Sequence, residues 1–347
     1  MKEFKVNHKH FGIFKNQMLE ERKNQKFSAA YQRTSYESFY LLSETLWHAD
    51  EYIDVIDSIT MRELEDFVPD LLSKMYIEVF AHGNFSVGET QELGKELEKA
   101  FSSPSQKLDP IVEERTLDIP PSTILTRQMQ IEDVNSAVQV YYQAGPHNVD
   151  QGVMLDMIQQ MIEMPFYHQL RTLEQLGYIV WSGYSQMNNV DGFNFIVQSN
   201  TKGPVYLQQR IEKFIMDFAQ TIKNISEEEF NQYRQILISK RLEKPNNLGE
   251  ETSRYWGVIE SRNYDFQYQD AEVEALKKLK LKELVVIYDR LFNSAEHKKA
   301  LVVQAVGKNH EREKPKGQLI ENHKDFKKNM SFYKNTAGDI KTRIIRN

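Results

Sequence analysis

Two neighbouring segments, 122–131 and 136–143, show the apolar alternation of β-strands. They limit the folds open to the chain, because an isolated pair of strands is only marginally stable and needs a larger sheet or a covering helix. The alternation in the second segment puts Val138, Val140 and Tyr142 on one face of the strand. The Gly-Pro step at 145–146 is a turn signal. We therefore predict a β-hairpin that ends there.

A long amphipathic helix is predicted after this hairpin. Pro165 marks its expected end, because proline removes a helical hydrogen bond and kinks or stops a helix. Strand patterns at 178–182 and 193–198, on both sides of the polar loop 188–192, then predict a second hairpin. We assign the methionines of the helix to the core and not to a cofactor site. The apolar stripe of the helix consists of Met154, Met157, Ile158, Met161 and Ile162.

The remainder of the chain is mainly helical in pattern. Pro204 is suited to a first helical turn, and Ser226 with Glu229 forms a capping box. Residues 281–292 continue the helical pattern, 301–305 indicate a last strand, and the charged segment 308–328 is predicted to be a loop or surface arm. This order of elements indicates an α+β two-layer sandwich. It predicts an antiparallel-rich sheet with helices on one face.

The N-terminal part is predicted to form a separate unit. A capping box at 60–63 opens a helix, 75–81 is predicted to be a strand, and 89–101 another helix. One strand between helices cannot make a sheet. Its partners therefore come from the rest of the chain, or the unit is the end of a domain that begins elsewhere. The polar, proline-bearing segment 102–110 is the best linker, and we place a domain boundary near residue 108.

Composition excludes several classes of function. The net charge of -6, with acidic and basic residues interleaved, offers no extended basic face to a nucleic acid. Without cysteine the chain has no disulfide, thiolate metal site or cysteine nucleophile. No run approaches the roughly 18 apolar residues of a membrane span, and the first residues show no signal-peptide pattern. We expect no nucleic-acid or membrane partner and a cytoplasmic location.

The sequence also lacks the common catalytic motifs. No two of the nine histidines are four residues apart, so neither His-Glu-x-x-His nor its inverted form, His-x-x-Glu-His, is present. Gly-x-Ser-x-Gly, Gly-x-Gly-x-x-Gly and a P-loop are missing too. We therefore expect no metal site in this chain. The nearest candidates are pairs without an evident third ligand, namely His8 with His10, His48 with Asp50, and His310 with Glu313.

The segment Arg171-Thr-Leu-Glu-Gln-Leu-Gly-Tyr178 places a guanidinium and a phenol where a helix is expected to give way to a strand. Together these groups can hold a peptide carbonyl and stabilise negative charge that develops on it. The plainer alternative is that Arg171 pairs with Glu174 on the helix surface while Tyr178 packs in the sheet. Spacing alone leaves both alternatives open.

Residues 166–183 resemble a segment in the C-terminal half of the insulysin branch of the pitrilysin family, whose members are zinc peptidases with the inverted motif His-x-x-Glu-His. Further segments resemble that branch in the expected order, so the likeness covers most of the chain from about residue 10 to 305. These segments are Leu71-Leu-Ser-Lys74, His82-Gly-Asn84, Phe195-Ile-Val-Gln-Ser199, Lys244-Pro245 and Tyr255-Trp-Gly257.

The resemblance implies a role for four side chains. It implies that Arg171 and Tyr178 contact the substrate and the developing oxyanion, and it places Tyr167 and Trp181 near the substrate pocket. In the family, zinc and its motif lie in an N-terminal lobe, where zinc-bound water attacks the peptide with a glutamate as general base. The resemblance therefore implies that peptide substrates and that zinc-bearing lobe are the partners of this chain.

The resemblance also implies a domain organisation and a function. Residues 1–108 would be the C-terminal part of a third insulysin-like domain and 109–347 a complete fourth domain. The chain would then be the substrate-binding lobe of a zinc metalloendopeptidase, inactive without the N-terminal lobe. The alternative is a noncatalytic peptide-binding or scaffold subunit of the same superfamily. A homo-oligomer is compatible with both.

Overall fold

The structure is a computed structural model that describes residues 6–73, 76–101 and 114–334. The chain forms two compact units, and neither is continuous in sequence. The helical unit comprises Met1–Gln25, Trp47–Glu113 and Pro245–Glu260, and the sheet unit comprises Lys26–Leu46, Glu114–Lys244 and Ser261–Asn347. The predicted linker 102–110 and the boundary near residue 108 lie outside the described residues.

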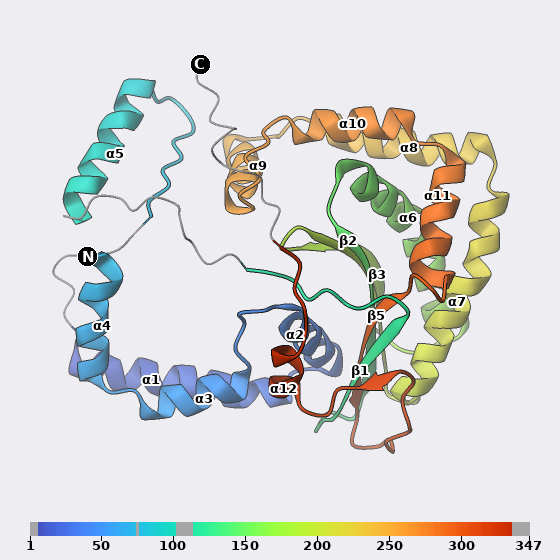
Figure 1. Cartoon of the computed structure of the whole chain (residues 1–347), viewed down its shortest axis with the longest axis horizontal. Coiled ribbons are helices and arrows are strands. Elements are labelled where there is room, and N and C mark those ends of the chain that lie inside the picture. Colours follow the sequence, from blue (N-terminus) through green and yellow to red (C-terminus); the bar gives the residue numbers. More distant parts are fainter. Residues whose placement is uncertain (1–5, 74–75, 102–113, 335–347) are drawn as a thin grey trace. The chain divides into compact units, whose positions relative to one another are not determined.

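The sheet unit contains a six-stranded sheet in the order β3-β4-β2-β5-β1-β6. The pairs β3/β4, β4/β2 and β2/β5 are antiparallel, whereas β1 is parallel to β5 and β6. The sheet is thus antiparallel-rich, as predicted (Figure 1). The strands are β1 (Thr123–Gln130), β2 (Ser136–Pro146), β3 (Val180–Met187), β4 (Val190–Ser199), β5 (Lys299–Val306) and β6 (Gln318–Leu319).

The first predicted hairpin is wrong, because β5 lies between β1 and β2. Leu301 of β5 pairs with Leu125 of β1 on one side and with Tyr141 of β2 on the other. Seven of the eight residues of β5 are buried, which is the pattern of a central strand rather than an edge. The second predicted hairpin, β3 with β4, is confirmed around a turn at Asn188 and Asn189, both with positive φ.

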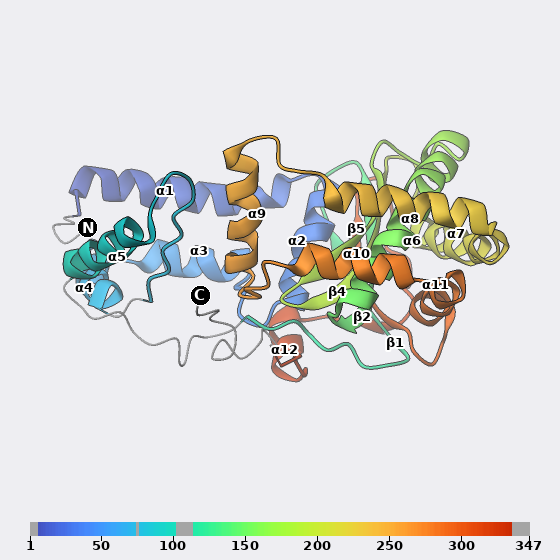
Figure 2. The same ribbon diagram turned by 90° about the horizontal axis from the view of Figure 1, so that it is seen from above.

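Most helices of the sheet unit cover one face of the sheet, as predicted. Val138, Val140 and Tyr142 of β2 pack there with apolar residues of these helices in the larger hydrophobic core. α8 and α10 lie side by side in both views (Figure 1, Figure 2). The helices are α6 (Val149–Tyr167), α7 (Pro204–Asn224), α8 (Glu227–Leu242), α10 (Tyr268–Lys278) and α11 (Leu281–Tyr288), followed by a π-helical turn, η3 (Asp289–Asn293).

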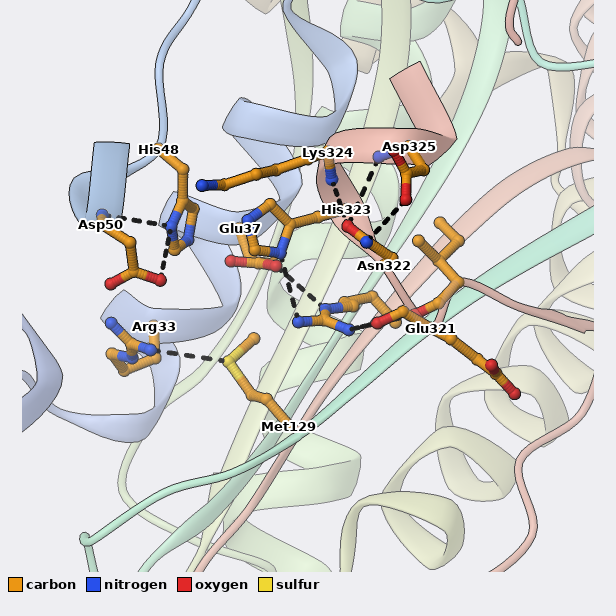
Figure 3. A network of polar contacts seen from close by, with 12 residues as sticks. Arg33, Glu37, His48, Asp50, Met129, Glu321, Asn322, His323, Lys324 and Asp325 are labelled. Carbon is orange, nitrogen blue, oxygen red and sulfur yellow. Dashed lines mark hydrogen bonds and ion pairs between the residues drawn. The ribbon is translucent and has the colours of Figure 1, made fainter. Parts of the chain in front are cut away.

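A further helix, α2 (Ala30–Leu42), packs against the opposite face and was not predicted there. Tyr40 and Leu41 share a second core with the alternate residues of the strands. Glu37, 2% exposed, accepts a hydrogen bond from Arg127 Nε of β1 at 3.0 Å. Arg127 Nη1 also donates to the carbonyl oxygen of Glu321 at 2.7 Å, and Figure 3 labels the two acceptors, Glu37 and Glu321. The opposite faces of β1, β2 and β5 thus have their own hydrophobic cover.

Two predictions about segment ends need correction. Pro165 does not stop α6, because it lies in the last turn and the chain continues into a π-helical segment, η2 (His168–Leu173). The segment 308–328 is more than a loop, since it contains β6 and α12 (His323–Lys328). β6 joins the sheet by parallel pairing with β1 at Leu125 and Thr126. The strand at 299–306 is therefore not the last.

The helical unit has the predicted capping box at Thr60, whose backbone N–H donates to Glu63 at 2.7 Å. The strand predicted at 75–81 is wrong, as described residues 76–81 are not in a strand. The ring of Phe80 instead lies 6.4 Å from that of Trp256 on α9. The helices are α1 (His8–Asn24), α3 (Ala49–Ser58), α4 (Met61–Ser73), α5 (Val87–Phe101) and α9 (Leu248–Glu260), and a 3-10 turn, η1 (Gln25–Phe27), follows α1. None of the described helices is long and apolar enough to cross a membrane.

Candidate functional site

The π-helical turn after α6 sets the position of Arg171. The N–H of Glu174 donates to the carbonyl oxygen of Gln169, five residues earlier, at 3.0 Å, which is the hydrogen-bond pattern of a π-helix. The N–H of Leu176 donates to the carbonyl oxygen of Leu170 at 3.0 Å, and both leucine side chains are buried in the core. π-turns of this kind occur frequently at functional sites. The buried side chains of Leu170 and Leu176 therefore anchor the turn, while Arg171 stays at the surface.

The chain between the turn and β3 passes very close to β4. A Cβ added at Gly177 would lie 1.8 Å from the carbonyl oxygen of Gln198, a backbone atom that cannot easily move. The N–H of Gln198 also donates to the carbonyl oxygen of Ile179 at 2.9 Å. Gln175 adopts φ of 52°, a left-handed conformation that turns the chain toward the sheet. These contacts fix the approach of the backbone to Tyr178.

Arg171 joins three of the four predicted site residues in one contact cluster. Its Nη1 donates to the carbonyl oxygen of Gly177 at 2.7 Å, and its Nε donates to the hydroxyl of Tyr167 at 2.9 Å. The guanidinium carbon lies 4.5 Å from the centre of the Tyr178 ring and 5.8 Å from that of Tyr167. Both distances fall within the range of cation–π attraction. The guanidinium therefore lies against both phenol rings, and its hydrogen bond to the carbonyl oxygen of Gly177 holds it there.

Both Arg171 and Tyr178 keep donors for a ligand. Tyr178 is 77% exposed, and within the described chain its hydroxyl makes no hydrogen bond. Arginine has five N–H donors, of which the two contacts above use two. The pair thus presents a charged donor and a neutral donor side by side.

The alternative pairing of Arg171 with Glu174 is not what the structure shows. Both carboxylate oxygens of Glu174 accept from Arg210 of α7, at 2.7 and 2.6 Å. These hydrogen bonds hold the pKa of the Glu174 carboxyl below its usual range. Tyr178 precedes β3 and does not pack in the sheet. Sequence reasoning could not find Arg210, because 36 residues and a hairpin separate it from Glu174.

Trp181 occupies a different position from the other three residues. It lies on β3, which is at the edge of the sheet, and pairs with Ile196 of β4. Its side chain is 43% exposed, and its ring covers Gly183, where an added Cβ would lie 2.6 Å from Trp181 Cζ2. Trp181 thus offers an apolar surface on the strand that follows Tyr178.

A buried polar network, which the sequence did not reveal, lies at the other end of α6. Asp191, fully buried, accepts from the Tyr184 hydroxyl at 2.7 Å and from Gln151 Nε2 at 2.8 Å, and it faces His147 Nδ1 at 2.8 Å. His147 Nε2 lies 2.8 Å from the Tyr268 hydroxyl. Burial, together with nearby acidic groups, raises the pKa of Tyr184 and of Tyr268. The network ties β2, β3, β4, α6 and α10 together, and no local sequence signal marks it.

In two of the three weak metal-candidate pairs the histidine has a structural partner. His48 caps α3 by accepting from the N–H of Asp50, and His310 Nδ1 lies 2.9 Å from the buried hydroxyl of Ser136. The cluster around Arg171 offers a guanidinium, two phenols and an indole, whereas zinc prefers imidazole, thiolate and carboxylate ligands. A zinc ion therefore does not fit at this site.

Comparison with known proteins agrees with this architecture. The family described as "PQQ synthase PqqF-like, C-terminal lobe domain 4" matches residues 157–256. Insulin-degrading enzyme of Homo sapiens is 32% identical over 297 residues, which are 84% of this chain and 29% of that protein. The chain thus spans less than a third of the length of this relative.

Solved structures show the same fold. The crystal structure of pitrilysin matches 96% of this chain and 36% of its own chain, with a TM-score of 0.83 and 19% identity. The crystal structure of a peptidase M16 inactive domain from Pseudomonas fluorescens covers 89% of this chain and 73% of its own, with a TM-score of 0.59 and 16% identity. The chain is therefore a homologue of insulin-degrading enzyme and related proteins of the M16 peptidase family, and it matches their C-terminal half.

Proposed function

We propose that this chain is the substrate-binding lobe of an insulysin-like zinc endopeptidase. Arg171 and Tyr178 would hold a backbone carbonyl of a bound peptide, and Tyr167 and Trp181 would line the place where the peptide lies. The single observation that carries the proposal is the guanidinium of Arg171 stacked 4.5 Å from the ring of the exposed Tyr178. The homology to a peptidase family supplies the class of substrate.

The contacts of Arg171 support a binding role rather than a role in stability. A surface arginine that served stability would be expected to form an ion pair, yet the neighbouring carboxylate of Glu174 is engaged by Arg210. Arg171 is instead ordered by a carbonyl and a phenol, so its positive charge is not neutralised by these contacts. A preorganised charged donor of this kind stabilises an oxyanion without further ordering at the moment of reaction.

Zinc enters the proposal through another part of the enzyme. The side chains of this site do not suit the metal, and the sequence lacks His-x-x-Glu-His. In the proposal a zinc-bearing N-terminal lobe supplies Lewis-acid chemistry, while Arg171 and Tyr178 bind and orient the peptide. In the proposal, residues 1–108 are the C-terminal part of a third domain and residues 109–347 are the fourth domain. The enzyme would act in the cytoplasm.

The proposal is tested by measuring peptide binding and hydrolysis separately. Fluorescence anisotropy with a short labelled peptide should give saturable binding to the 347-residue chain, weakened by Arg171→Gln and by Tyr178→Phe. A quenched fluorescent peptide with added zinc should not be cleaved by the chain alone. Chelator-sensitive turnover that co-purifies with the chain and drops on Tyr178→Phe would refute the requirement for a second lobe. Undiminished peptide binding in both variants would refute the site.

The second candidate is a noncatalytic peptide-binding or scaffold subunit, which the missing zinc motif favours. The two candidates differ in their response to a separately produced M16 N-terminal lobe that carries His-x-x-Glu-His. The first predicts hydrolysis that appears on mixing and depends on Tyr178. The second predicts peptide binding that is indifferent to zinc and to the added lobe.

A further inference from the structure

A cavity of about 340 Å³ lies in the sheet unit at the C-terminal end of β2. Its wall is formed by the end of β2, the first turn of α6, the π turn η3 and the start of β5. This volume is within the range of sites that bind small molecules. The wall includes the apolar residues Pro121, Ala144, Pro146, Ile287 and Leu291, and its accessible surface is mainly apolar.

The polar groups of this cavity are cationic or neutral. Arg290, His297, Lys299 and Tyr333 line it, and no carboxylate is among the described residues of the wall. Lys299 Nζ donates to Asp118 at 2.8 Å and to the Tyr333 hydroxyl at 2.9 Å. The charge of Lys299 is thus balanced by a carboxylate outside the cavity.

Among the described residues, no carboxylate balances the charge of Arg290. In the described part of the chain its guanidinium makes no ion pair or hydrogen bond. The adjacent carboxylate of Asp289 pairs with Lys223 at 2.8 Å and with Asn293 Nδ2 at 3.0 Å, so it is directed to other partners. Arg290 therefore contributes one uncompensated positive charge to a mainly apolar cavity.

The backbone around the cavity is specialised at two points. β2 contains a bulge between Gln143 and Gly145, and Gly145 has φ of 112°, a conformation that other residues rarely adopt. The second point is η3, where the N–H of Ser294 donates to the carbonyl oxygen of Asp289 at 2.8 Å in a π turn. β-Bulges and π turns are enriched near functional sites.

A second cavity of about 410 Å³ adjoins the first and shares Gln151, Ile287 and Arg290 with it. Met154 and Val286 add apolar surface there, and Val286 is 67% exposed. Lys282 and Glu283 are the charged residues of that wall besides Arg290, and Glu283 is engaged in capping α11 through the N–H of Lys280. Arg290 therefore lies where the two cavities meet.

We propose that the cavity at Arg290 binds a small organic monoanion, a carboxylate carried on an apolar body. The guanidinium would take the carboxylate in a charge-assisted hydrogen bond, and Ile287, Leu291 and Pro121 would cover the apolar part. The site is separate from the cluster around Arg171, since Gln151 and Tyr167 lie at opposite ends of α6, roughly 24 Å apart for a rise of about 1.5 Å per residue. It does not depend on the proposed peptide-binding function.

Isothermal titration calorimetry with 4-phenylbutyrate tests the proposal, with the neutral 4-phenylbutanamide as the matched ligand. We expect saturable binding of the acid to the full chain and binding of the amide that is weaker by about tenfold or more, since hydrogen bonds to charged groups are the stronger ones. Arg290→Gln should weaken binding of the acid by about tenfold and leave the amide unchanged. Arg290 is exposed, so this substitution does not threaten folding.

Lys213→Gln on α7 is the matched control, as it removes another exposed positive charge away from the cavity. It should leave binding of both ligands unchanged. No saturable binding of the acid, equal binding of acid and amide, or an unchanged affinity in Arg290→Gln would overturn the proposal. Loss of binding in Arg171→Gln would overturn it too, because the ligand would then occupy the other site.

Discussion

The guanidinium carbon of Arg171 lies 4.5 Å from the centre of the Tyr178 ring, while 77% of the Tyr178 side chain remains exposed. The contact orders both side chains without burying them. Ligand binding then loses little conformational freedom, because the groups are already held in place.

Arg171→Lys should weaken peptide binding by about tenfold, because lysine retains the charge but lacks the planar fork that contacts Tyr167, Gly177 and Tyr178 together. The free energy of unfolding should change by less than about 1 kcal/mol, as expected for a partly exposed cation. Fluorescence anisotropy and urea unfolding measure the two effects. Arg312→Lys, at an exposed position, is the control and should change neither. Equal peptide affinity in both variants would contradict the assigned role.

Gly177→Ala should lower the free energy of unfolding by more than about 2 kcal/mol, since its Cβ would lie 1.8 Å from the Gln198 carbonyl oxygen. The backbone atoms of β4 would have to move, and the turn to Tyr178 with them. Urea unfolding followed by circular dichroism measures this loss. In Gly203→Ala the nearest contact is a flexible carboxylate at 3.3 Å, and the change should stay below about 1 kcal/mol. Similar losses in the two variants would show that the close approach is unimportant.

Arg127→Met should destabilise the sheet unit by about 3 kcal/mol, because it leaves the carboxylate of Glu37 buried without its guanidinium. The same change removes the hydrogen bond to the carbonyl oxygen of Glu321. Lys213→Met removes an exposed ion pair and should cost no more than about 1 kcal/mol. Thermal or urea unfolding of the two variants gives the comparison, and a loss for Arg127→Met as small as for Lys213→Met would refute it.

The pair of Glu174 and Arg210 should stabilise the protein at neutral pH and not in acid. Hydrogen bonds from Arg210 lower the pKa of Glu174 in the folded protein below its ordinary value of 4.5. Protons therefore bind more tightly to the unfolded chain. The ion pair contributes fully to the free energy of unfolding when the pH is above the ordinary pKa of Glu174, and this contribution is lost as the pH falls through the pKa in the folded protein. Glu174→Gln should destabilise at pH 7 and have progressively less effect below about pH 4.

Urea unfolding of both proteins across this pH range measures the effect. Glu163→Gln, at an exposed position of α6, serves as the control for removal of one negative charge. A destabilisation by Glu174→Gln that is the same at pH 7 and in acid would show that the charge of Glu174 is not responsible.

The elements that the sequence predicted well are those set by local patterns. The capping boxes at Thr60 and Ser226, the first-turn proline at 204 and the alternation of 178–198 each mark an element that the structure contains. The prediction of a strand at 75–81 failed because residues 76–81 have no strand partner among the described residues. Tyr76 and Val79 stay exposed, and the ring of Phe80 lies beside that of Trp256 on α9. A local apolar pattern does not report whether a partner strand is present.

The sequence by itself determined the helices with their caps and the strands of the second hairpin, because these depend on contacts within a few residues. Only the tertiary structure decided that β5 separates β1 from β2, that α2 covers the second face of the sheet, and that Glu174 pairs with Arg210. Because Glu174 pairs with Arg210, Arg171 instead contacts the phenol rings of Tyr167 and Tyr178. Such partners lie tens of residues or more apart in sequence, and they are selected by the joint packing of strands and helices, which no local pattern encodes.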